Sequence, residues 1–179
     1  SDPPEQKSAV QRRVEAEFDA LLDQVVARDF PFLGACYGVG TVGAHQGAII
    51  DRTYGEPVGV VEVSLTDAGI TDPLLAGIPP RFDAFVGHKE AMRSLPSSAT
   101  LLASSTTCPV QMFRVRENIY ATQFHPELDV NGITARIHAY TDYGYFAPTE
   151  VHVPLAAVRE REVLHPSRML RTFVDRYAR

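Results

Sequence analysis

The feature that most constrains this chain is a cysteine between two glycines, in the segment Phe30-Pro-Phe-Leu-Gly-Ala-Cys-Tyr-Gly-Val-Gly40. A short apolar run leads into Gly34, and a helix-compatible segment over 37–46 follows Cys36. Because glycine has no Cβ, Gly34 and Gly38 permit strained backbone and close approach at a sharp strand-to-helix turn. This layout is typical of a nucleophile elbow, with cysteine in the place of serine.

A second motif, Gln123-Phe-His-Pro-Glu127, ends a strand-like run over 119–124. A cysteine nucleophile needs an imidazole to take and return its proton, and the imidazole needs a carboxylate to fix its tautomer. His125 and Glu127 are close in sequence, and Pro126 restrains the backbone between them. We expect both side chains at the C-terminal edge of a sheet, where open α/β folds keep their sites.

Together, Gly34-Ala-Cys-Tyr-Gly38 and Gln123-Phe-His-Pro-Glu127 resemble the two signatures of class I (triad-type) glutamine amidotransferases. The relevant members are the glutaminase domain of GMP synthase and its free-standing relatives. The resemblance covers nearly the whole chain and implies that Cys36 attacks the side-chain amide of glutamine. It implies that His125 acts as base and then as acid, and that Glu127 orients His125. Hydrolysis of the resulting thioester would give glutamate, with ammonia released.

The same resemblance implies an α/β, flavodoxin-like fold: an open, mostly parallel sheet with flanking helices and a small antiparallel portion. We interpret residues 1–179 as a single domain of this type. Family members carry strand and helix units before the region that matches here, with a glycine-rich loop that supplies one oxyanion donor. Those N-terminal units are therefore expected to be missing from this sequence. The backbone N–H of Tyr37 is expected to supply the other oxyanion donor.

Three residues are candidates for the substrate pocket. Gly40 stands where the family usually has a glutamine that helps to hold the substrate, so the pocket could admit a larger compound. His88, in Gly87-His-Lys-Glu90, lies where relatives carry a serine–histidine loop near the glutamine pocket; a solvated loop histidine is the alternative. Gln123 is the third candidate, because it opens the second motif.

Composition narrows the range of partners. A formal net charge of −5 and a pI near 5.6 indicate neither a nucleic-acid nor a membrane partner. No apolar stretch approaches the roughly 20 residues that span a bilayer, and no signal-peptide pattern is present, so a cytoplasmic location is expected. We expect no cofactor and no metal, since His45, His88 and His125 lack zinc-ligand spacing. Cys108 is expected to be a packed loop residue.

The remaining patterns predict helices alternating with strands, which favours the α/β class. Expected helices cover 8–28, 37–46 and 129–140, with one turn at 72–77 and an amphipathic tail over 155–177 interrupted at Pro166. Expected strands cover 30–33, 58–65, 82–86, 100–104, 110–115 and 119–124, with a hairpin turn at 117–118. An aromatic group, Tyr140, Tyr143, Tyr145 and Phe146, is expected to be core.

Three functional hypotheses follow. The first is a glutaminase that hydrolyses glutamine and passes ammonia to a separate synthetase subunit. The second is a free-standing hydrolase or transferase of γ-glutamyl compounds, which Gly40 favours. The third is a catalytically silent regulatory or binding domain, which the missing oxyanion loop supports and the intact Cys, His and Glu set opposes.

Overall fold

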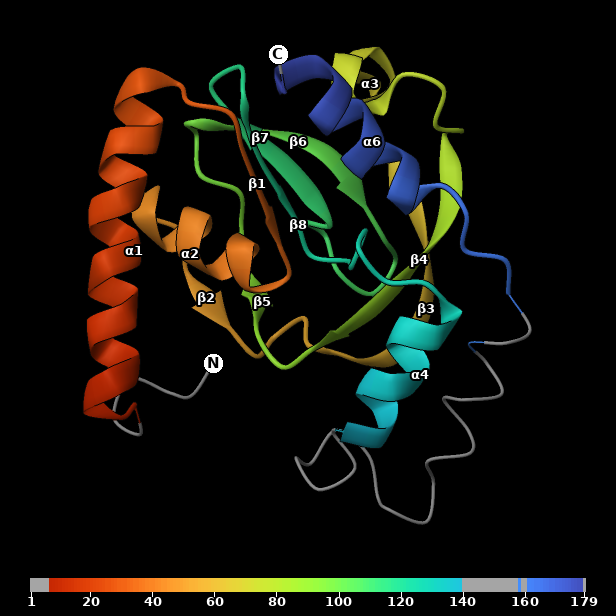
Figure 1. Cartoon of the computed structure of the whole chain (residues 1–179), viewed down its shortest axis with the longest axis horizontal. Helices are drawn as coiled ribbons and strands as arrows, with labels where there is room; N and C mark the ends of the chain where they lie inside the picture. Colours follow the sequence, from red (N-terminus) through yellow and green to blue (C-terminus); the bar gives the residue numbers. More distant parts are fainter. Residues whose placement is uncertain (1–6, 140–157, 159–160, 179) are drawn as a thin grey trace.

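The chain is built around one six-stranded sheet (Figure 1). A computed structural model describes residues 7–139, 158 and 161–178. The strand order is β1-β8-β7-β6-β3-β4. The strands span Phe32–Ala35 (β1), Glu56–Leu65 (β3), Arg81–His88 (β4), Ala99–Ser104 (β6), Met112–Val115 (β7) and Ile119–Thr122 (β8). Two short strands, Ile50–Asp51 (β2) and Ala91–Met92 (β5), form a separate antiparallel pair.

The strand directions correct one expectation. In the described sheet only β1 and β8 are parallel; the pairs β8–β7, β7–β6, β6–β3 and β3–β4 are antiparallel. The prediction of a mostly parallel sheet is therefore wrong for this part of the chain. For the pairs β6–β7 and β7–β8 the physical reason is the short connection, because parallel neighbours need a crossover of about a dozen residues or more. The turn between β7 and β8 takes only residues 116–118, with Arg116 at φ 53°.

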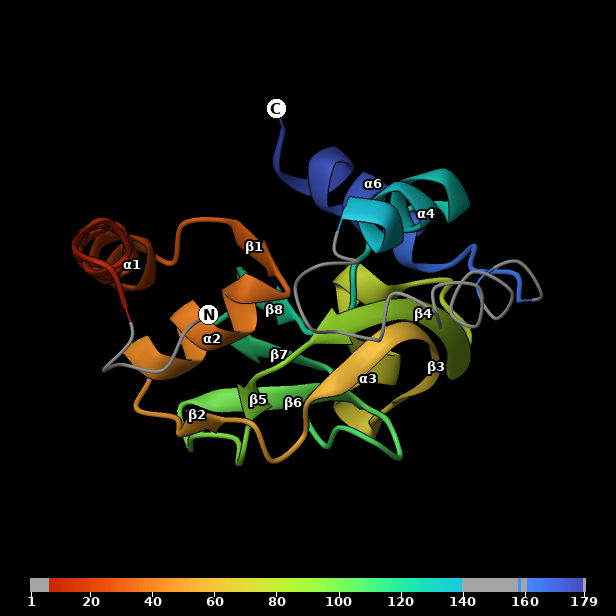
Figure 2. The same cartoon turned by 90° about the horizontal axis from the view of Figure 1, so that it is seen from below.

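Helices cover both faces of the sheet. α1 (Ala9–Arg28) and α2 (Tyr37–His45) pack in a cluster with Ile119 and Ala121 of β8. α6 (Pro166–Tyr177) and the 3-10 helix η2 (Pro73–Leu75) pack in a second cluster with Tyr120. Successive strand residues point to opposite faces, so the two clusters lie on opposite sides. Figure 1 and Figure 2 show this arrangement, with α1 and α2 well apart from α6.

A third, smaller cluster positions the segment that follows β8. α4 (Val130–Ala139) buries Ile133 and Ile137 against Val58 of β3 and Phe85 of β4. Its start is capped by Asp129, because the Asp129 carboxylate accepts a hydrogen bond of 2.7 Å from the N–H of Gly132. The helix is therefore held at the β3–β4 edge of the sheet (Figure 1).

Most predicted elements are confirmed with shifts of a few residues at their ends. α1 begins after Ser8, whose hydroxyl accepts from the N–H of Gln11 at 3.1 Å. The short helix α3 (Asp67–Thr71) and strands β2 and β5 are not evident from the sequence pattern. The prediction for the tail is confirmed over 166–177, where α6 lies, and wrong over 161–165. Residues 161–165 are not helical, and α6 begins at Pro166, since proline fits the first helical turn, where its missing N–H is not needed.

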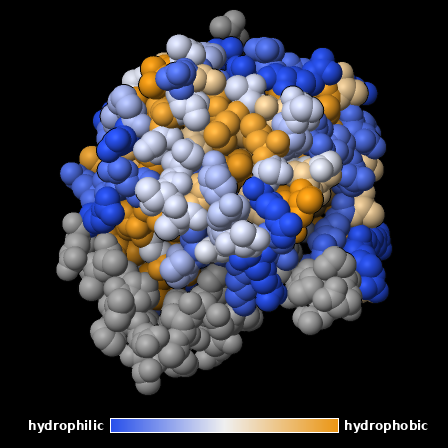
Figure 3. Space-filling model, turned by 180° about the vertical axis from the view of Figure 1, so that it is seen from behind, coloured by the Kyte–Doolittle hydropathy of each residue, from blue (hydrophilic) through white to orange (hydrophobic). Residues whose placement is uncertain are grey.

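The surface of the described chain mixes apolar and polar residues. Figure 3 shows apolar patches on the rear face that are broken up by polar side chains. On α1, Leu22 and Val25 are buried, whereas Val10 and Phe18 are exposed. None of the helices in the described ranges is long and apolar enough to cross a membrane. The aromatic group predicted at residues 140–146 lies outside the described residues.

The elbow joins β1 to α2, and its strain lies at the cysteine itself. Cys36 has φ 50° and ψ −83°, in the region that L-residues rarely adopt. Gly34 provides the close approach, because a Cβ there would lie 2.8 Å from the Cα of Gly38 and 3.1 Å from the Cε1 of Phe32. A Cβ on Gly38 would meet nothing within 4 Å. Of the two glycines, Gly34 is the one the packing requires.

We therefore expect Gly34→Ala to lower the free energy of unfolding by about 1–3 kcal/mol, because backbone must shift to admit the methyl group. Gly38→Ala is the matched control and should change it by less than about 1 kcal/mol, since space is open there. Urea unfolding followed by circular dichroism measures both values. Equal effects of the two substitutions would contradict this account of the elbow.

Candidate active site

The sheet curls so that its two edges contribute to one site. The N–H of Cys36, just after edge strand β1, donates to the carbonyl of Thr122 on β8 at 2.7 Å. The segment after β8 then crosses to the other edge, where the N–H of His125 donates to the carbonyl of Phe85 on β4 at 2.8 Å. Phe124 in the segment after β8 makes an edge-to-face contact with Phe82 of β4, with the ring centroids 5.7 Å apart.

The predicted pair His125 and Glu127 is formed. The Nδ1 of His125 and the Oε1 of Glu127 are 2.6 Å apart, and the His125 side chain is 3% exposed. Its Nε2 is buried and satisfies no hydrogen-bond geometry with the described residues. Burial alone would lower the pKa of His125, but the nearby Cys36 side chain and Glu127 raise it to about 9. The imidazole is therefore positioned between a sulfur and a carboxylate.

Glu127 is held ionised by its neighbours. Burial would raise the pKa of Glu127, but the hydrogen bond from His125 and the charges of His125 and Arg136 lower it below its ordinary value. The Nη1 of Arg136, on α4, lies 3.3 Å from the Nδ1 of His125. Sequence reasoning missed Arg136, because nothing in the α4 sequence separates it from the ordinary cations of a helix surface. Only the packing of α4 brings it to this site.

A cavity of about 660 Å³ lies over the cysteine. It brings together all three predicted pocket residues, Gly40, His88 and Gln123, with Cys36 and Tyr37. Further lining comes from α1 and the residue Lys7 before it, and from α2, β2, the 87–90 segment and α4. These lining residues are Lys7, Glu15, Ala16, Phe18, Asp19, Leu22, Thr41, Ala44, Ile50, Gly87, Lys89, Glu90 and Arg136. The lining therefore carries charges of both signs around a partly exposed cysteine, which suits a small zwitterionic molecule.

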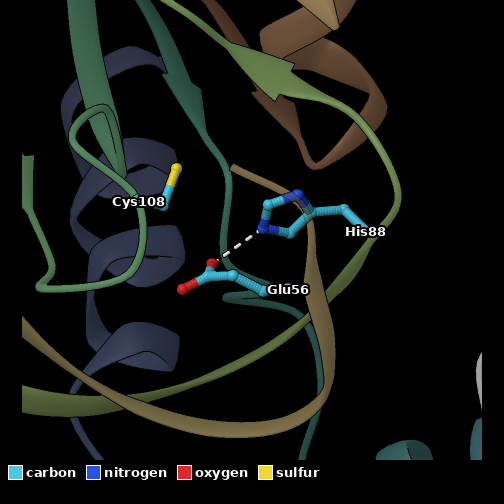
Figure 4. Close-up of side chains that lie close together, drawn as sticks. All are labelled: Glu56, His88 and Cys108. Atoms are coloured by element: carbon cyan, nitrogen blue, oxygen red, sulfur yellow. Dashed lines mark hydrogen bonds and ion pairs between the residues drawn. The ribbon is translucent and has the colours of Figure 1, made fainter. Parts of the chain in front are cut away.

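His88 lines the cavity but is buried rather than solvated. Its Nε2 lies 2.7 Å from the Oε2 of Glu56, and its Nδ1 lies 3.0 Å from the carbonyl of Glu90. Figure 4 shows the imidazole and the Glu56 carboxylate facing each other, with Cys108 nearby. The alternative of a solvated loop histidine is wrong. Sequence reasoning missed Glu56, although an acidic residue at the start of an apolar strand was a usable signal.

The cluster in Figure 4 is a second set of Cys, His and Glu, and its chemistry differs from the first. The Glu56 carboxylate also accepts hydrogen bonds from Thr107 and Gln111. Burial would raise the pKa of Glu56, but these bonds and the one with His88 lower it. Burial and the Glu56 charge raise the pKa of the Cys108 thiol to about 12.

The second cluster is therefore a structural hydrogen-bond network, in which the buried Oε1 of Gln111 has no partner within the described chain. Glu56, His88 and Cys108 offer ligand atoms within 4.8 Å of one another, a spacing that a metal ion could use. However, both carboxylate oxygens already accept hydrogen bonds, and the Cys108 thiol donates to the carbonyl of Val110. The three histidines considered as zinc ligands do not meet, since the Nε2 of His45 pairs with the Oδ1 of Asp23 on α1 at 3.0 Å.

Comparisons with known proteins show the family and the fold of this chain. The sequence model of the family described as glutamine amidotransferase class-I matches residues 7–137. The chain is 32% identical over 101 residues to a glutamine-hydrolyzing GMP synthase subunit from Methanobrevibacter smithii, and 34% identical over 102 residues to one from Thermoplasma acidophilum. Each alignment covers 56% of this chain, and 52% and 50% of the relatives. The chain thus spans about half the length of these relatives.

A solved glutamine amidotransferase from Thermotoga maritima has a similar fold. The TM-score is 0.79 at 23% sequence identity, covering 99% of this chain and 74% of the other. The likeness supports the expected flavodoxin-like α/β class, with the strand directions given above. The chain therefore belongs to the class I glutamine amidotransferase family.

The raised pKa of His125 predicts a pH-dependent stability. The ordinary value of 6.5 rises to about 9 in the folded chain, so protonated His125 stabilises the fold fully below about pH 6.5. This contribution, on the order of 2–3 kcal/mol, should be lost as the pH rises through 9. Urea unfolding at pH 6, 8 and 10 measures the free energy of unfolding of the wild type and of His125→Gln. The difference between these two free energies should shrink as the pH rises. A difference that stays constant with pH would contradict a stabilising contribution from protonated His125.

The two cysteines should differ in reactivity. Cys36 is partly exposed at the cavity, whereas Cys108 is fully buried with a raised thiol pKa. Iodoacetamide should therefore alkylate Cys36 in the native chain and Cys108 only after unfolding. Intact-mass spectrometry before and after urea, with Cys36→Ala as control, measures this. Native alkylation of Cys108 would show that the second cluster opens to solvent.

Proposed function

We propose that this chain is the glutamine-hydrolysing part of an amidotransferase, with Cys36 as nucleophile, His125 as general base and acid, and Glu127 as the group that orients His125. The observation that carries the proposal is the juxtaposition at the cavity. A strained, partly exposed cysteine at a helix start lies beside a buried histidine, which is paired at 2.6 Å with a carboxylate. Membership of the family supports the same assignment.

The chemistry runs in two steps. The Cys36 sulfur attacks the side-chain carbonyl carbon of glutamine, and its proton passes to the Nε2 of His125. The C–N bond then breaks, His125 returns the proton to the leaving nitrogen, and ammonia departs from a γ-glutamyl thioester. Water attacks the thioester with His125 again taking a proton, which releases glutamate and restores the thiol. Glu127 stabilises the charged imidazole throughout.

The backbone N–H of Tyr37 is suited to hold the oxyanion. Tyr37 is the first residue of α2, and the first N–H groups of a helix have no partner within the helix. They also lie at the positive end of the helix dipole, which stabilises the negative oxygen of the tetrahedral intermediate. We treat residues 1–179 as one catalytic domain of this kind.

The ammonia acceptor would be a separate synthetase chain. The relatives at 32% and 34% identity are each named as one subunit of a glutamine-hydrolyzing GMP synthase, and such a name indicates a further subunit in those proteins. On this proposal the chain alone hydrolyses glutamine slowly, and a synthetase partner accelerates it.

A second candidate is a free-standing hydrolase or transferase of γ-glutamyl compounds. Gly40 favours it, because a Cβ there would meet only the Cγ2 of Ile50, at 4.0 Å, so space is open where the family carries a glutamine. A cavity of about 660 Å³ is also roomy for glutamine. Turnover of γ-glutamylglycine by the chain alone, faster than turnover of glutamine, would select this second candidate.

We expect Cys36→Ala to abolish release of ammonia from glutamine while the fold persists. Cys108→Ala is the matched control and should keep the activity, because Cys108 lies in the buried cluster. Glu127→Gln should retain a rate at least ~10-fold above that of Cys36→Ala, since an orienting group contributes less than a nucleophile. A coupled glutamate dehydrogenase assay measures each rate.

Covalent labelling separates a working site from a silent domain. A diazo-ketone analogue of glutamine should add once to the wild type and not to Cys36→Ala. Undiminished ammonia release by Cys36→Ala would contradict the proposal that Cys36 is the nucleophile. A chain that is neither labelled nor active would be the regulatory or binding domain of the third hypothesis.

A further inference from the structure

The side chain of Gln123 has a buried polar atom without a partner, beside the proposed nucleophile. Gln123 is 1% exposed, and its Oε1 has no hydrogen-bond partner within the described chain. Leaving a buried acceptor unsatisfied costs free energy, so such atoms call for an explanation. Gln123 also lines the cavity over Cys36. The residue that carries the unpaired acceptor is therefore part of the cavity wall, while its oxygen is buried behind that wall.

The backbone around Gln123 fixes where this amide lies. The preceding residue, Thr122, accepts the N–H of Cys36 at 2.7 Å, and His125 follows two residues later. The N–H of Gln123 donates to the carbonyl of Gln111 at 2.8 Å, which holds its backbone in place. Gln123 thus directly follows the residue that binds the backbone of the proposed nucleophile and lies two residues before the proposed base. The backbone of Gln123 is therefore held at the part of the cavity wall that joins the proposed nucleophile to the proposed base.

An amide oxygen is a hydrogen-bond acceptor, so the unpaired oxygen of Gln123 needs a donor such as an N–H group as its partner. The terminal torsion of glutamine is broad, so a rotation of the amide presents the oxygen toward the cavity. At the reacting end, a carboxamide substrate offers the –NH₂ that leaves as ammonia. The glutamine side-chain oxygen can accept from this group without competing for its proton, because a neutral amide is not basic.

We propose that the side-chain oxygen of Gln123 accepts an N–H of the substrate carboxamide and directs the leaving nitrogen toward the Nε2 of His125. This inference rests on the proposed function and makes Gln123 a substrate-contacting residue that favours amides over esters. The free energy that the unsatisfied acceptor costs in the free protein is then recovered when an amide binds.

The test compares two substrates that differ only in the leaving group, which is –NH₂ in one and –OCH₃ in the other. Glutamine carries an N–H at the leaving group, whereas glutamate γ-methyl ester does not. Gln123→Met keeps the length of the side chain but removes the acceptor. We expect Gln123→Met to lower kcat/KM for glutamine by about 10- to 100-fold and to change that for the ester by less than about threefold. Its melting temperature should be equal to or above that of the wild type, since an unsatisfied buried atom is removed.

Gln111→Met is the matched control. The Nε2 of Gln111 donates to the Oε2 of Glu56 at 2.8 Å, and its Oε1, like that of Gln123, is buried without a partner in the described chain. Gln111 does not line the cavity, however. This substitution should lower the melting temperature and leave the ratio of amide to ester activity unchanged. Gln123→Asn serves if Gln123→Met does not fold; it withdraws the oxygen by one methylene and should show the same selective loss for glutamine.

The outcomes distinguish the two proposals. Equal losses for amide and ester in Gln123→Met, or no loss for either, would overturn the role of Gln123 and leave the Cys36 mechanism standing. If the wild-type chain hydrolyses neither substrate, both the proposed function and this inference are contradicted.

Discussion

Two backbone hydrogen bonds hold the candidate site together, and the rest of the structure is arranged around them. The N–H of Cys36 donates to Thr122, and the N–H of His125 donates to Phe85. The first bond continues the parallel β1–β8 pair, while the second reaches β4 at the opposite edge of the sheet. Because both bonds involve one short segment at the end of β8, the sheet has to curl, and its curl places a histidine beside a cysteine that lies far away in the chain.

The two Cys–His–Glu groups show why residue type alone does not define a catalytic site. Cys36 lies at a cavity, and the buried Nε2 of its neighbour His125 is still without a hydrogen-bond partner in the described chain. Around Glu56, by contrast, both carboxylate oxygens accept hydrogen bonds, and burial raises the pKa of the Cys108 thiol to about 12. In the first group a ring nitrogen has no hydrogen-bond partner within the described chain, and the cysteine lines a cavity. The second group uses its hydrogen bonds to hold β3, β4 and the 105–111 loop together. Reactivity follows from that difference.

The second group still matters for the first. His88 bonds Glu56 with one ring nitrogen and lies 3.0 Å from the carbonyl of Glu90 with the other, so the buried network anchors the 87–90 segment. That segment forms one wall of the cavity opposite α1 and α2. Gln123 is tied to the same network, since its backbone is held by Gln111, which bonds Glu56. A hydrogen-bonded polar cluster thus supports one wall of the cavity.

The elbow around Cys36, the pairing of His125 with Glu127 and the family could all be predicted from the sequence, because each depends on residues that are close together in the chain. Most helices and strands could be located as well, since hydrophobic periodicity is a local property. The strand directions, the burial of His88 against Glu56, the approach of Arg136 to His125 and the unpartnered acceptor on Gln123 became visible only in the folded chain. These contacts join residues that the curl of the sheet and the packing of α4 bring together, and no local pattern encodes such distances.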